Sequence, residues 1–114
     1  MAKTELIKGS TEIIILSLLQ TKDRYGYELA QEINRLSEGY LQFKEGTLYP
    51  ALKRLELAEL VVSYWQSSPE GPRRKYYALT GEGERVLAAN KKEWATFQKV
   101  MRRFLGGEPL YARI

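Results

Sequence analysis

The leucines near the centre of the chain constrain the fold most strongly, because they repeat with the period of a helix. Leu48, Leu52 and Leu55 are spaced i, i+4, i+7, so they share one helical face. Pro50 is tolerated only near the start of a helix, where its missing N–H has little or nothing to donate to. The helix should therefore begin around Glu45 to Thr47.

The opposite face of this helix carries polar, basic and aromatic side chains. They are Thr47, Tyr49, Lys53 and Arg54, with Lys44 just ahead of the helix. Such a face suits a DNA major groove, where Lys53 can meet a phosphate or a guanine edge, and Thr47 and Tyr49 a phosphate or a thymine methyl. It equally suits an amphipathic helix packed on a domain surface. Tyr49 could instead belong to the core, and Arg54 could pair with nearby acids.

Two helices are expected before this one. The first should begin at Ser10 or Thr11 and is apolar nearly all round, so it is buried on most sides, either in the head or partly in a subunit interface. The second should open near Gly26 and end near Gly39, a position typical of left-handed backbone. Its inner face is Leu29, Ile33 and Leu36, and the connection after it carries Leu41 and Phe43 inward. Two helices joined by a short turn, the second with exposed cations, follow helix-turn-helix order.

After residue 60 the pattern changes from a helical period to a period of two. Residues 61–66 and 73–79 are typical of strands, and the Pro- and Gly-containing segment 67–72 is typical of a loop. The sequence predicts an antiparallel hairpin with Arg73, Arg74 and Lys75 directly after its turn. In a winged helix, Arg73 and Arg74 would track the DNA backbone or enter a minor groove. Lys75 shares strand parity with Leu79, so it is expected to point inward at its base and to reach outward at its tip. The alternative is an edge strand that its charges protect from aggregation.

A long final helix is expected from the N-cap Thr80 to Leu105, where Gly106 and Gly107 end it. Its apolar residues step by three and four, as in a coiled-coil seam. A helix of about 38 Å is too long to bury that seam on a small head. The predicted partner is a second copy of the chain. The predicted interface residues are Asn90, Trp94, Phe97, Met101 and Phe104.

Length and composition narrow the classes of function. The 114 residues fit one domain, and the net charge of +4 mildly favours a polyanionic partner. There is no Cys and no His, which excludes Cys/His zinc sites, thiol switches and imidazole catalysis. No segment is long enough for a membrane span or built like a signal peptide, so a cytoplasmic protein without a membrane partner is expected. No acid–base pair is forced together by spacing, so an enzyme and a cofactor are not expected.

The chain resembles the PadR family of bacterial transcriptional regulators. Three segments carry the resemblance: Tyr25-Gly26-Tyr27-Glu28-Leu29, then Gly46-Thr47-Leu48-Tyr49-Pro50-Ala51-Leu52-Lys53-Arg54-Leu55-Glu56, and Arg73-Arg74-Lys75-Tyr76-Tyr77-Ala78-Leu79-Thr80 with Gly83. The single long last helix is similar to that of the short subfamily, whose members dimerise through it. The resemblance implies a ligand-responsive repressor that binds a pseudo-palindromic operator in double-stranded DNA as a homodimer. The loop 67–72 departs from more basic wings, because it carries an acid and two prolines.

These expectations together give a mainly α, α+β winged helix-turn-helix protein. It should comprise a DNA-binding domain at residues 1–79 with a three-helix head, a two-stranded wing and a loosely docked arm up to Lys8. A dimerisation helix at residues 80–105 and a flexible tail at residues 106–114 follow. The predicted DNA-binding residues are Lys44, Thr47, Tyr49, Lys53, Arg54, Arg73, Arg74 and Lys75.

Trp94 has two interpretations. It falls near the expected two-fold axis, where it is either an interface anchor or one wall of a gap that admits a planar aromatic effector. Some members of the short subfamily are thought of in the second way. For the whole protein, the rival to a DNA-binding regulator is a winged-helix module that binds another protein. DNA affinity that is absent or does not fall with salt would favour that rival.

Overall fold

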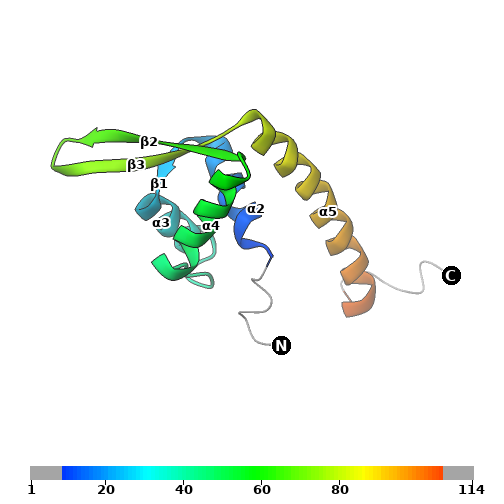
Figure 1. Cartoon of the computed structure of the whole chain (residues 1–114). Helices are drawn as coiled ribbons and strands as arrows, with labels where there is room; N and C mark the ends of the chain where they lie inside the picture. Colours follow the sequence, from blue (N-terminus) through cyan, green and yellow to red (C-terminus); the bar gives the residue numbers. More distant parts are fainter. Residues whose placement is uncertain (1–8, 107–114) are drawn as a thin grey trace.

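The computed structural model describes residues 9–106 (Figure 1). In chain order the elements are α2 (Thr11–Thr21), β1 (Arg24–Tyr25), α3 (Gly26–Leu36), α4 (Glu45–Leu57), β2 (Val61–Ser68), β3 (Gly71–Leu79) and α5 (Gly81–Leu105). Helices α2, α3 and α4 form a head from which the β2–β3 hairpin projects on one side and α5 on the other (Figure 1). This is the predicted mainly α, α+β winged helix-turn-helix fold.

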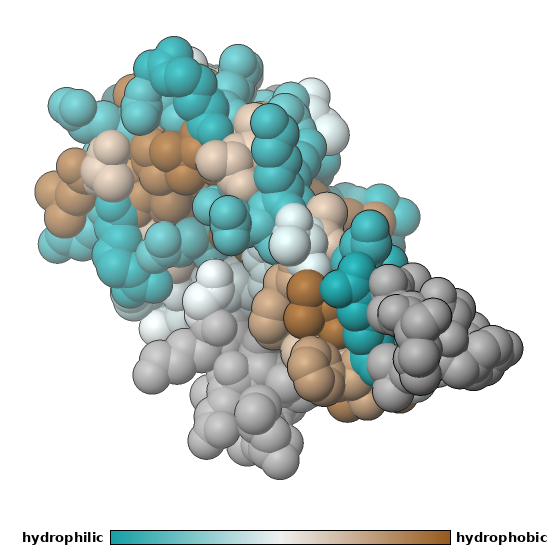
Figure 2. Space-filling view, turned by 90° about the vertical axis from the view of Figure 1, so that its right-hand side faces the viewer, coloured by the Kyte–Doolittle hydropathy of each residue, from teal (hydrophilic) through white to brown (hydrophobic). Residues whose placement is uncertain are grey.

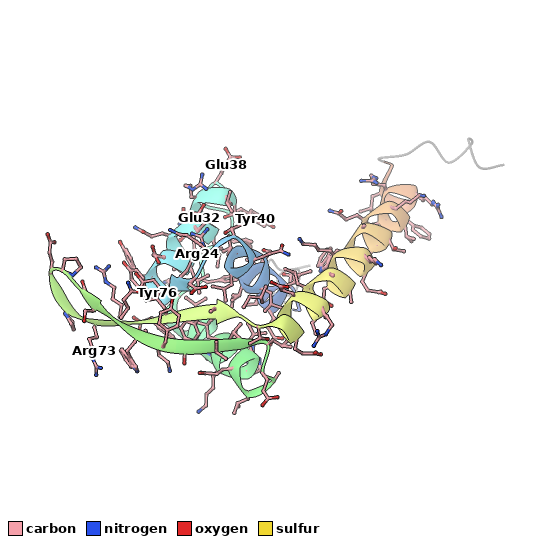
Figure 3. All side chains as sticks on the ribbon, turned by 90° about the horizontal axis from the view of Figure 1, so that it is seen from above. Arg24, Glu32, Glu38, Tyr40, Arg73 and Tyr76 are labelled. Atoms are coloured by element: carbon pink, nitrogen blue, oxygen red, sulfur yellow. The ribbon has the colours of Figure 1, made fainter. Side chains whose placement is uncertain are left out.

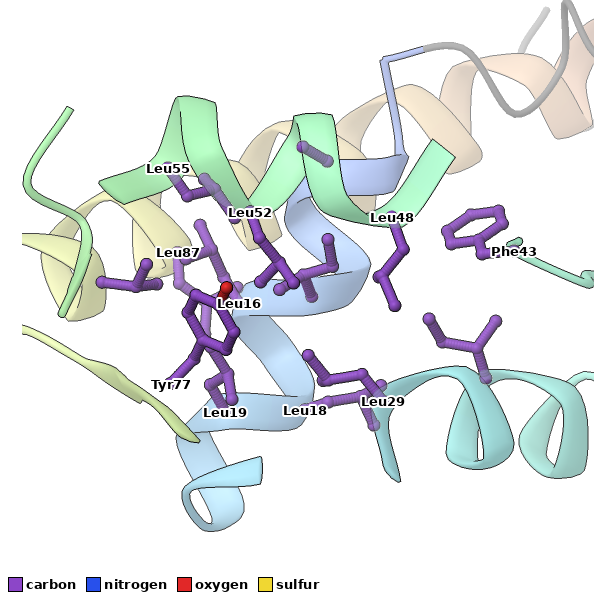
Figure 4. Packing of buried hydrophobic residues seen from close by; sticks show 14 residues of the cluster. Leu16, Leu18, Leu19, Leu29, Phe43, Leu48, Leu52, Leu55, Tyr77 and Leu87 are labelled. Atoms are coloured by element: carbon purple, nitrogen blue, oxygen red, sulfur yellow. The ribbon is translucent and has the colours of Figure 1, made fainter. Parts of the chain in front are cut away.

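The hydrophobic core lies where the three head helices meet the base of the hairpin (Figure 4). The predicted inner face of α4 is buried, with Leu48, Leu52 and Leu55 each at most 2% exposed. Leu87 of α5 reaches the same core and is fully buried. Each fully buried leucine contributes about 1.5–3 kcal/mol relative to an exposed one, so this cluster fixes the position of α4 on the head.

The sheet has three strands in the order β1-β3-β2, all antiparallel. The two-residue strand β1 was not predicted, because strands were expected only after residue 60. Tyr25 of β1 pairs with Tyr76. The hairpin strands are also longer than predicted, since pairing continues to Ser68 opposite Gly71 and only two residues form the turn.

Thr80 and Gly83 form a tightly packed joint between the end of the hairpin and α5. The Thr80 hydroxyl donates to the Glu59 carbonyl oxygen at 2.8 Å and accepts from the Gly83 N–H at 3.0 Å, which confirms Thr80 as the N-cap. A Cβ at Gly83 would lie 2.2 Å from the Leu60 carbonyl oxygen. Only glycine therefore lets the first turn of α5 approach the end of the α4–β2 connection this closely. At its other end α5 stops at Gly106, whose φ of 93° is left-handed.

Other predictions on the described residues have mixed outcomes. Ser10 is the N-cap of α2, and Gly39 has the expected left-handed φ of 82°. Leu36 was expected inside but is 60% exposed, because it is the last residue of α3 and the core ends one turn earlier at Ile33. The arm at residues 1–8 and nearly all of the tail at residues 106–114 lie outside the described residues. None of the described helices is both long and apolar enough to cross a membrane.

Candidate nucleic-acid interface

Helices α3 and α4 form the helix-turn-helix. The Glu28 carboxylate accepts from the Tyr25 N–H at 3.2 Å, which caps the start of α3. At the other end the Gly39 N–H donates to the Asn34 carbonyl oxygen at 2.8 Å, and the backbone reverses there. Buried Phe43 then anchors the connection. Helix α4 begins at Glu45 with Lys44 as its N-cap residue, within the predicted range.

The outward face of α4 carries the predicted polar residues. Lys44, Thr47 and Lys53 are all exposed, and within α4 Thr47 and Lys53 point away from the buried leucines. Arg54 is exposed too, but its Nε donates to the Glu12 carboxylate at 2.8 Å. The alternative in which Arg54 pairs with an acid therefore holds in this structure. Lys53 is the stronger candidate for a DNA contact from the last turns of α4.

Tyr49 lies at the surface and also packs between the two helices. Its side chain is 45% exposed, so it is not a core residue, yet it packs against the start of α3. A Cβ at Gly26 would lie 2.7 Å from the Tyr49 hydroxyl oxygen. The missing side chain at Gly26 thus makes room for the Tyr49 ring, and this contact couples the two helices of the helix-turn-helix.

The three cations of the hairpin each lie over an aromatic ring. The Arg73 guanidinium is 5.4 Å from the centre of the Trp65 ring, that of Arg74 is 4.7 Å from Tyr25, and the Lys75 ammonium is 5.8 Å from Tyr77. Within the described residues, no ion pair involves these three cations. Cation–π contacts hold their charged groups in place without neutralising them.

The two faces of the hairpin differ. Ser63 donates to the Glu56 carboxylate of α4, so the face with Ser63, Trp65 and Lys75 is turned toward α4. Seen from above, the labelled Arg73 lies on the α4 side of the hairpin and Tyr76 on the α3 side (Figure 3).

An aromatic stack on the α3 side was missed by the sequence analysis. Tyr64 stacks on Tyr76 with ring centres 5.7 Å apart, and Tyr76 meets Tyr25 edge-on at 5.4 Å. The Tyr64 hydroxyl donates to the Asp23 carboxylate at 2.6 Å, and this hydrogen bond is the main reason that the pKa of Tyr64 is raised to about 12. The period of two shows which side chains share a face within each strand, but it does not show which strands are neighbours. The pairing of β1 with β3 brings Tyr25 beside Tyr76 and Tyr64.

A hollow of about 500 Å³ separates α4 from the hairpin. Its lining is aromatic and basic: Tyr25, Gly26, Tyr49, Trp65, Arg74, Lys75 and Tyr77. No Asp or Glu belongs to this described lining. The hollow therefore brings two of the predicted wing cations, Arg74 and Lys75, opposite Tyr49 of the predicted recognition helix.

The second half of α5 leaves the head with its apolar side exposed. Trp94 is 39%, Phe97 54% and Phe104 77% exposed, whereas Asn90 and Met101 are half-buried. Seen from the side of the molecule that α5 occupies, brown apolar residues gather in a patch beside teal charged ones (Figure 2). Trp94 and Phe97 touch edge-on with ring centres 5.9 Å apart.

Trp94 also lines a pocket of about 400 Å³ between α2 and α5. The wall is mostly apolar, with Ile13, Ile14 and Leu87 beside Trp94, and its polar members are Ser10, Ser17 and Lys91. Lys91 donates to the Gln20 side-chain oxygen at 2.8 Å, which ties α5 to the end of α2. Within residues 9–106 no cluster of three or more His, Cys, Asp or Glu side chains could hold a metal ion.

Comparison with known proteins agrees with this architecture. A PadR family transcription regulator from Clostridium difficile is 45% identical with a TM-score of 0.75, covering 85% of this chain and 99% of that one. A transcriptional regulator from Clostridium thermocellum is 37% identical with a TM-score of 0.81, covering 89% of this chain and 98% of that one. A transcriptional regulator of Mycobacterium tuberculosis is 32% identical over 104 residues, 91% of each chain.

The model of the PadR-like family of transcriptional regulators matches residues 15–89. This range takes in the helix-turn-helix, the whole hairpin and the joint to α5. The resemblance in the three sequence segments is thereby confirmed. The chain belongs to the PadR-like family of transcriptional regulators, which bind DNA and are not enzymes.

Proposed function

We propose that this protein is a ligand-responsive repressor that binds a pseudo-palindromic operator as a homodimer. The observation that carries the proposal is that the described part of the chain exposes two separate surfaces of different chemistry, one basic and one apolar. Tyr49 of α4 and the hairpin cations Arg74 and Lys75 border one hollow beside the exposed face of α4, and the apolar side of α5 is left exposed at the far side of the head. The first surface fits a polyanion, and the second fits another copy of the chain.

The proposed DNA surface is made of α4 and the hairpin. Helix α4 enters a major groove with Lys44, Thr47, Tyr49 and Lys53 toward the DNA, while Arg73, Arg74 and Lys75 meet the backbone or the adjacent minor groove. The support is exposure and charge: all of the α4 residues are exposed, and the hairpin cations have no acidic partner among the described residues. Arg54 takes a lesser part because Glu12 holds its guanidinium.

The proposed dimer joins two α5 helices along Asn90, Trp94, Phe97, Met101 and Phe104. Three of these carry large rings or chains that are 39–77% exposed in the single chain, and such surface is unfavourable in water. A two-fold axis through this seam would present two copies of α4 to the same side of a duplex. The operator would then be two-fold symmetric, with half-sites about 10 base pairs or a multiple apart.

The proposed effector is a planar, neutral or anionic aromatic molecule. It would enter between the two copies of Trp94, beside the apolar pocket that Ile13, Ile14 and Leu87 share with that ring. Lys91 in the lining favours a neutral or negative ligand over a cation. A ligand that prefers one angle between the heads would change the half-site spacing and so lower operator affinity. The competing role for Trp94 is that of an interface anchor alone.

Selection of bound duplexes from a random DNA pool tests the operator. We expect an enriched inverted repeat whose affinity falls with salt concentration. No enrichment, or affinity independent of salt, would support the rival function, a winged-helix module that binds protein.

Titration with a panel of planar aromatic compounds tests the effector. Tryptophan emission is followed in a Trp65→Phe background, so that only Trp94 reports. We expect quenching that saturates, together with loss of the selected operator. If no compound quenches while the dimer stays intact, Trp94 is an anchor and the regulator lacks this sensor.

A further inference from the structure

We propose that the hollow between α4 and the hairpin holds one sugar–phosphate unit of the DNA backbone, and that Trp65 is the positioning residue that forms its wall. The proposal rests on the proposed DNA surface and adds to it a residue that charge alone does not reveal. Trp65 is 58% exposed in the middle of β2, on the face of the hairpin that is turned toward α4. Its ring lies under the guanidinium of Arg73, and it shares the lining of the hollow with Arg74 and Lys75.

The position of the hollow determines which part of a nucleic acid can reach it. A helix in the major groove and a hairpin in the next minor groove lie on either side of one DNA strand. Any concave surface between the two elements therefore faces the backbone of that strand. Here the concave surface runs from Tyr49 on α4 to Trp65 and Lys75 on the hairpin.

The chemistry of the lining matches a sugar–phosphate unit better than a base or an apolar molecule. Arg74 and Lys75 supply positive charge for a phosphate, and no described acid lies in the lining to oppose it. The faces of Trp65 and Tyr49 supply apolar surface against which a deoxyribose can pack. The Gly26 position contributes no side chain, and the ring and hydroxyl of Tyr49 occupy that space.

Trp65 also orders a cation. The Arg73 guanidinium lies 5.4 Å from the centre of the Trp65 ring, on the same face of the hairpin. Removing the ring should therefore release Arg73 as well as remove the wall. Because the contact is to the backbone, the effect should be the same on every DNA sequence.

Fluorine NMR on the full-length protein labelled with fluorotryptophan tests the proposal. The chain has two tryptophans, so two resonances are expected, and Trp65→Phe assigns them without altering Trp94. A mixed-sequence duplex about three helical turns long is added at low ionic strength, where binding needs no operator. On binding, we expect the Trp65 resonance to shift and to be broadened less by a soluble paramagnetic agent. Fluorescence anisotropy of labelled DNA measures the binding separately.

Affinity measurements complete the test. Trp65→Ala should weaken binding by about two- to tenfold on operator and mixed-sequence DNA alike, and Trp65→Phe should restore most of it. The matched control is Val62→Ala, which removes a 52% exposed side chain from the opposite face of the same strand and should leave affinity unchanged. Thermal unfolding confirms that each variant is folded.

The two levels of the proposal fail in different ways. If wild-type protein shows no salt-dependent DNA binding, the proposed function itself is wrong. If wild-type protein binds DNA and Lys53→Ala weakens binding, but the Trp65 resonance does not move and Trp65→Ala binds like wild type, the inference about the hollow alone is overturned.

Discussion

At the scale of single residues, the structure gives different partners to side chains that look alike in the sequence. Lys53 and Arg54 are neighbouring cations on α4, yet Glu12 of α2 reaches only Arg54. The sequence raised the possibility of such a pair but could not identify the acid, because the two residues lie 42 positions apart. Tyr49 was likewise left open between core and surface, and it packs on Gly26 while remaining 45% exposed.

Lys53→Ala and Arg54→Ala should differ in their effect on DNA binding. If Lys53 touches a phosphate, its loss should reduce the salt slope by about one. If it reads a base, specific binding should weaken by about 1–3 kcal/mol instead. Arg54→Ala should change binding less, because that guanidinium already has an anionic partner. Anisotropy titrations at several salt concentrations measure both quantities, and equal effects of the two variants would contradict this ranking.

The Tyr64–Asp23 hydrogen bond should make the stability of the hairpin sensitive to alkaline pH. The folded protein holds the Tyr64 proton to a pKa of about 12, whereas an unfolded chain releases it near 10. Between these values the unfolded state loses its proton first, so stability falls as pH rises. The contribution is fully present below about pH 10 and lost as pH rises through about 12.

Tyr64→Phe should therefore lose less stability than wild type over this pH range, although its stack on Tyr76 remains. Urea unfolding at several pH values measures the difference. Tyr27→Phe is a suitable control, since its hydroxyl meets Gln31 and not a carboxylate. A wild-type pH dependence equal to that of Tyr64→Phe would contradict the assignment.

At the scale of elements, local signals predicted the helices and their ends better than the strands. Thr80, Gly39 and Gly106 mark ends because their backbone and capping roles are local. The turn of the hairpin was predicted too long, because Pro and Gly in residues 67–72 suggested a loop. In the structure Pro72 lies in β3, which Pro can enter here because β1 pairs only with the other end of β3 and the missing N–H of Pro72 breaks no pairing with β1. Strand β1, the aromatic stack and the hollow depend on contacts between distant segments, which no periodicity encodes.

The joint at the start of α5 should tolerate no side chain at Gly83. A Cβ there would lie 2.2 Å from the Leu60 carbonyl oxygen and 2.6 Å from Leu79 Cδ1, so the backbone must move. We expect Gly83→Ala to lower the free energy of unfolding by about 1–3 kcal/mol. Gly81→Ala, two residues earlier with nothing within 4 Å of its Cβ, should be neutral or slightly stabilising. Urea denaturation of both variants decides this, and equal stabilities would show that the joint relaxes easily.

At the scale of the whole molecule, the described chain is elongated, with extents of 61 × 29 × 20 Å, because the β2–β3 hairpin projects on one side of the head and the second half of α5 on the other (Figure 1). The length of the last helix alone predicted that this helix would extend past the head. In the proposed dimer, a change of angle between the two heads would arise at the interface between copies, because Thr80 and Gly83 hold the start of α5 against its own head. Effector response and dimerisation would then share one surface.

The exposed apolar side of α5 should join two copies of the chain. Sedimentation equilibrium at micromolar concentration should give twice the chain mass of 13.2 kDa. Deleting everything after Lys92 should yield monomer or aggregate, because it removes the seam from Trp94 onward while leaving Leu87 in the core. Phe97→Ser combined with Phe104→Ser should weaken the dimer in the full-length chain, since both rings are more than half exposed in the single copy.

Lys99→Ala is the matched control, because it removes an exposed side chain from the same stretch of α5 without reducing the apolar seam. Its dimer should be as stable as that of wild type. A wild-type protein that sediments as a clean monomer would reject the dimer and, with it, the effector site between two copies of Trp94. The DNA contacts proposed for α4 and Trp65 within one head would remain testable on that monomer, since they need no second copy.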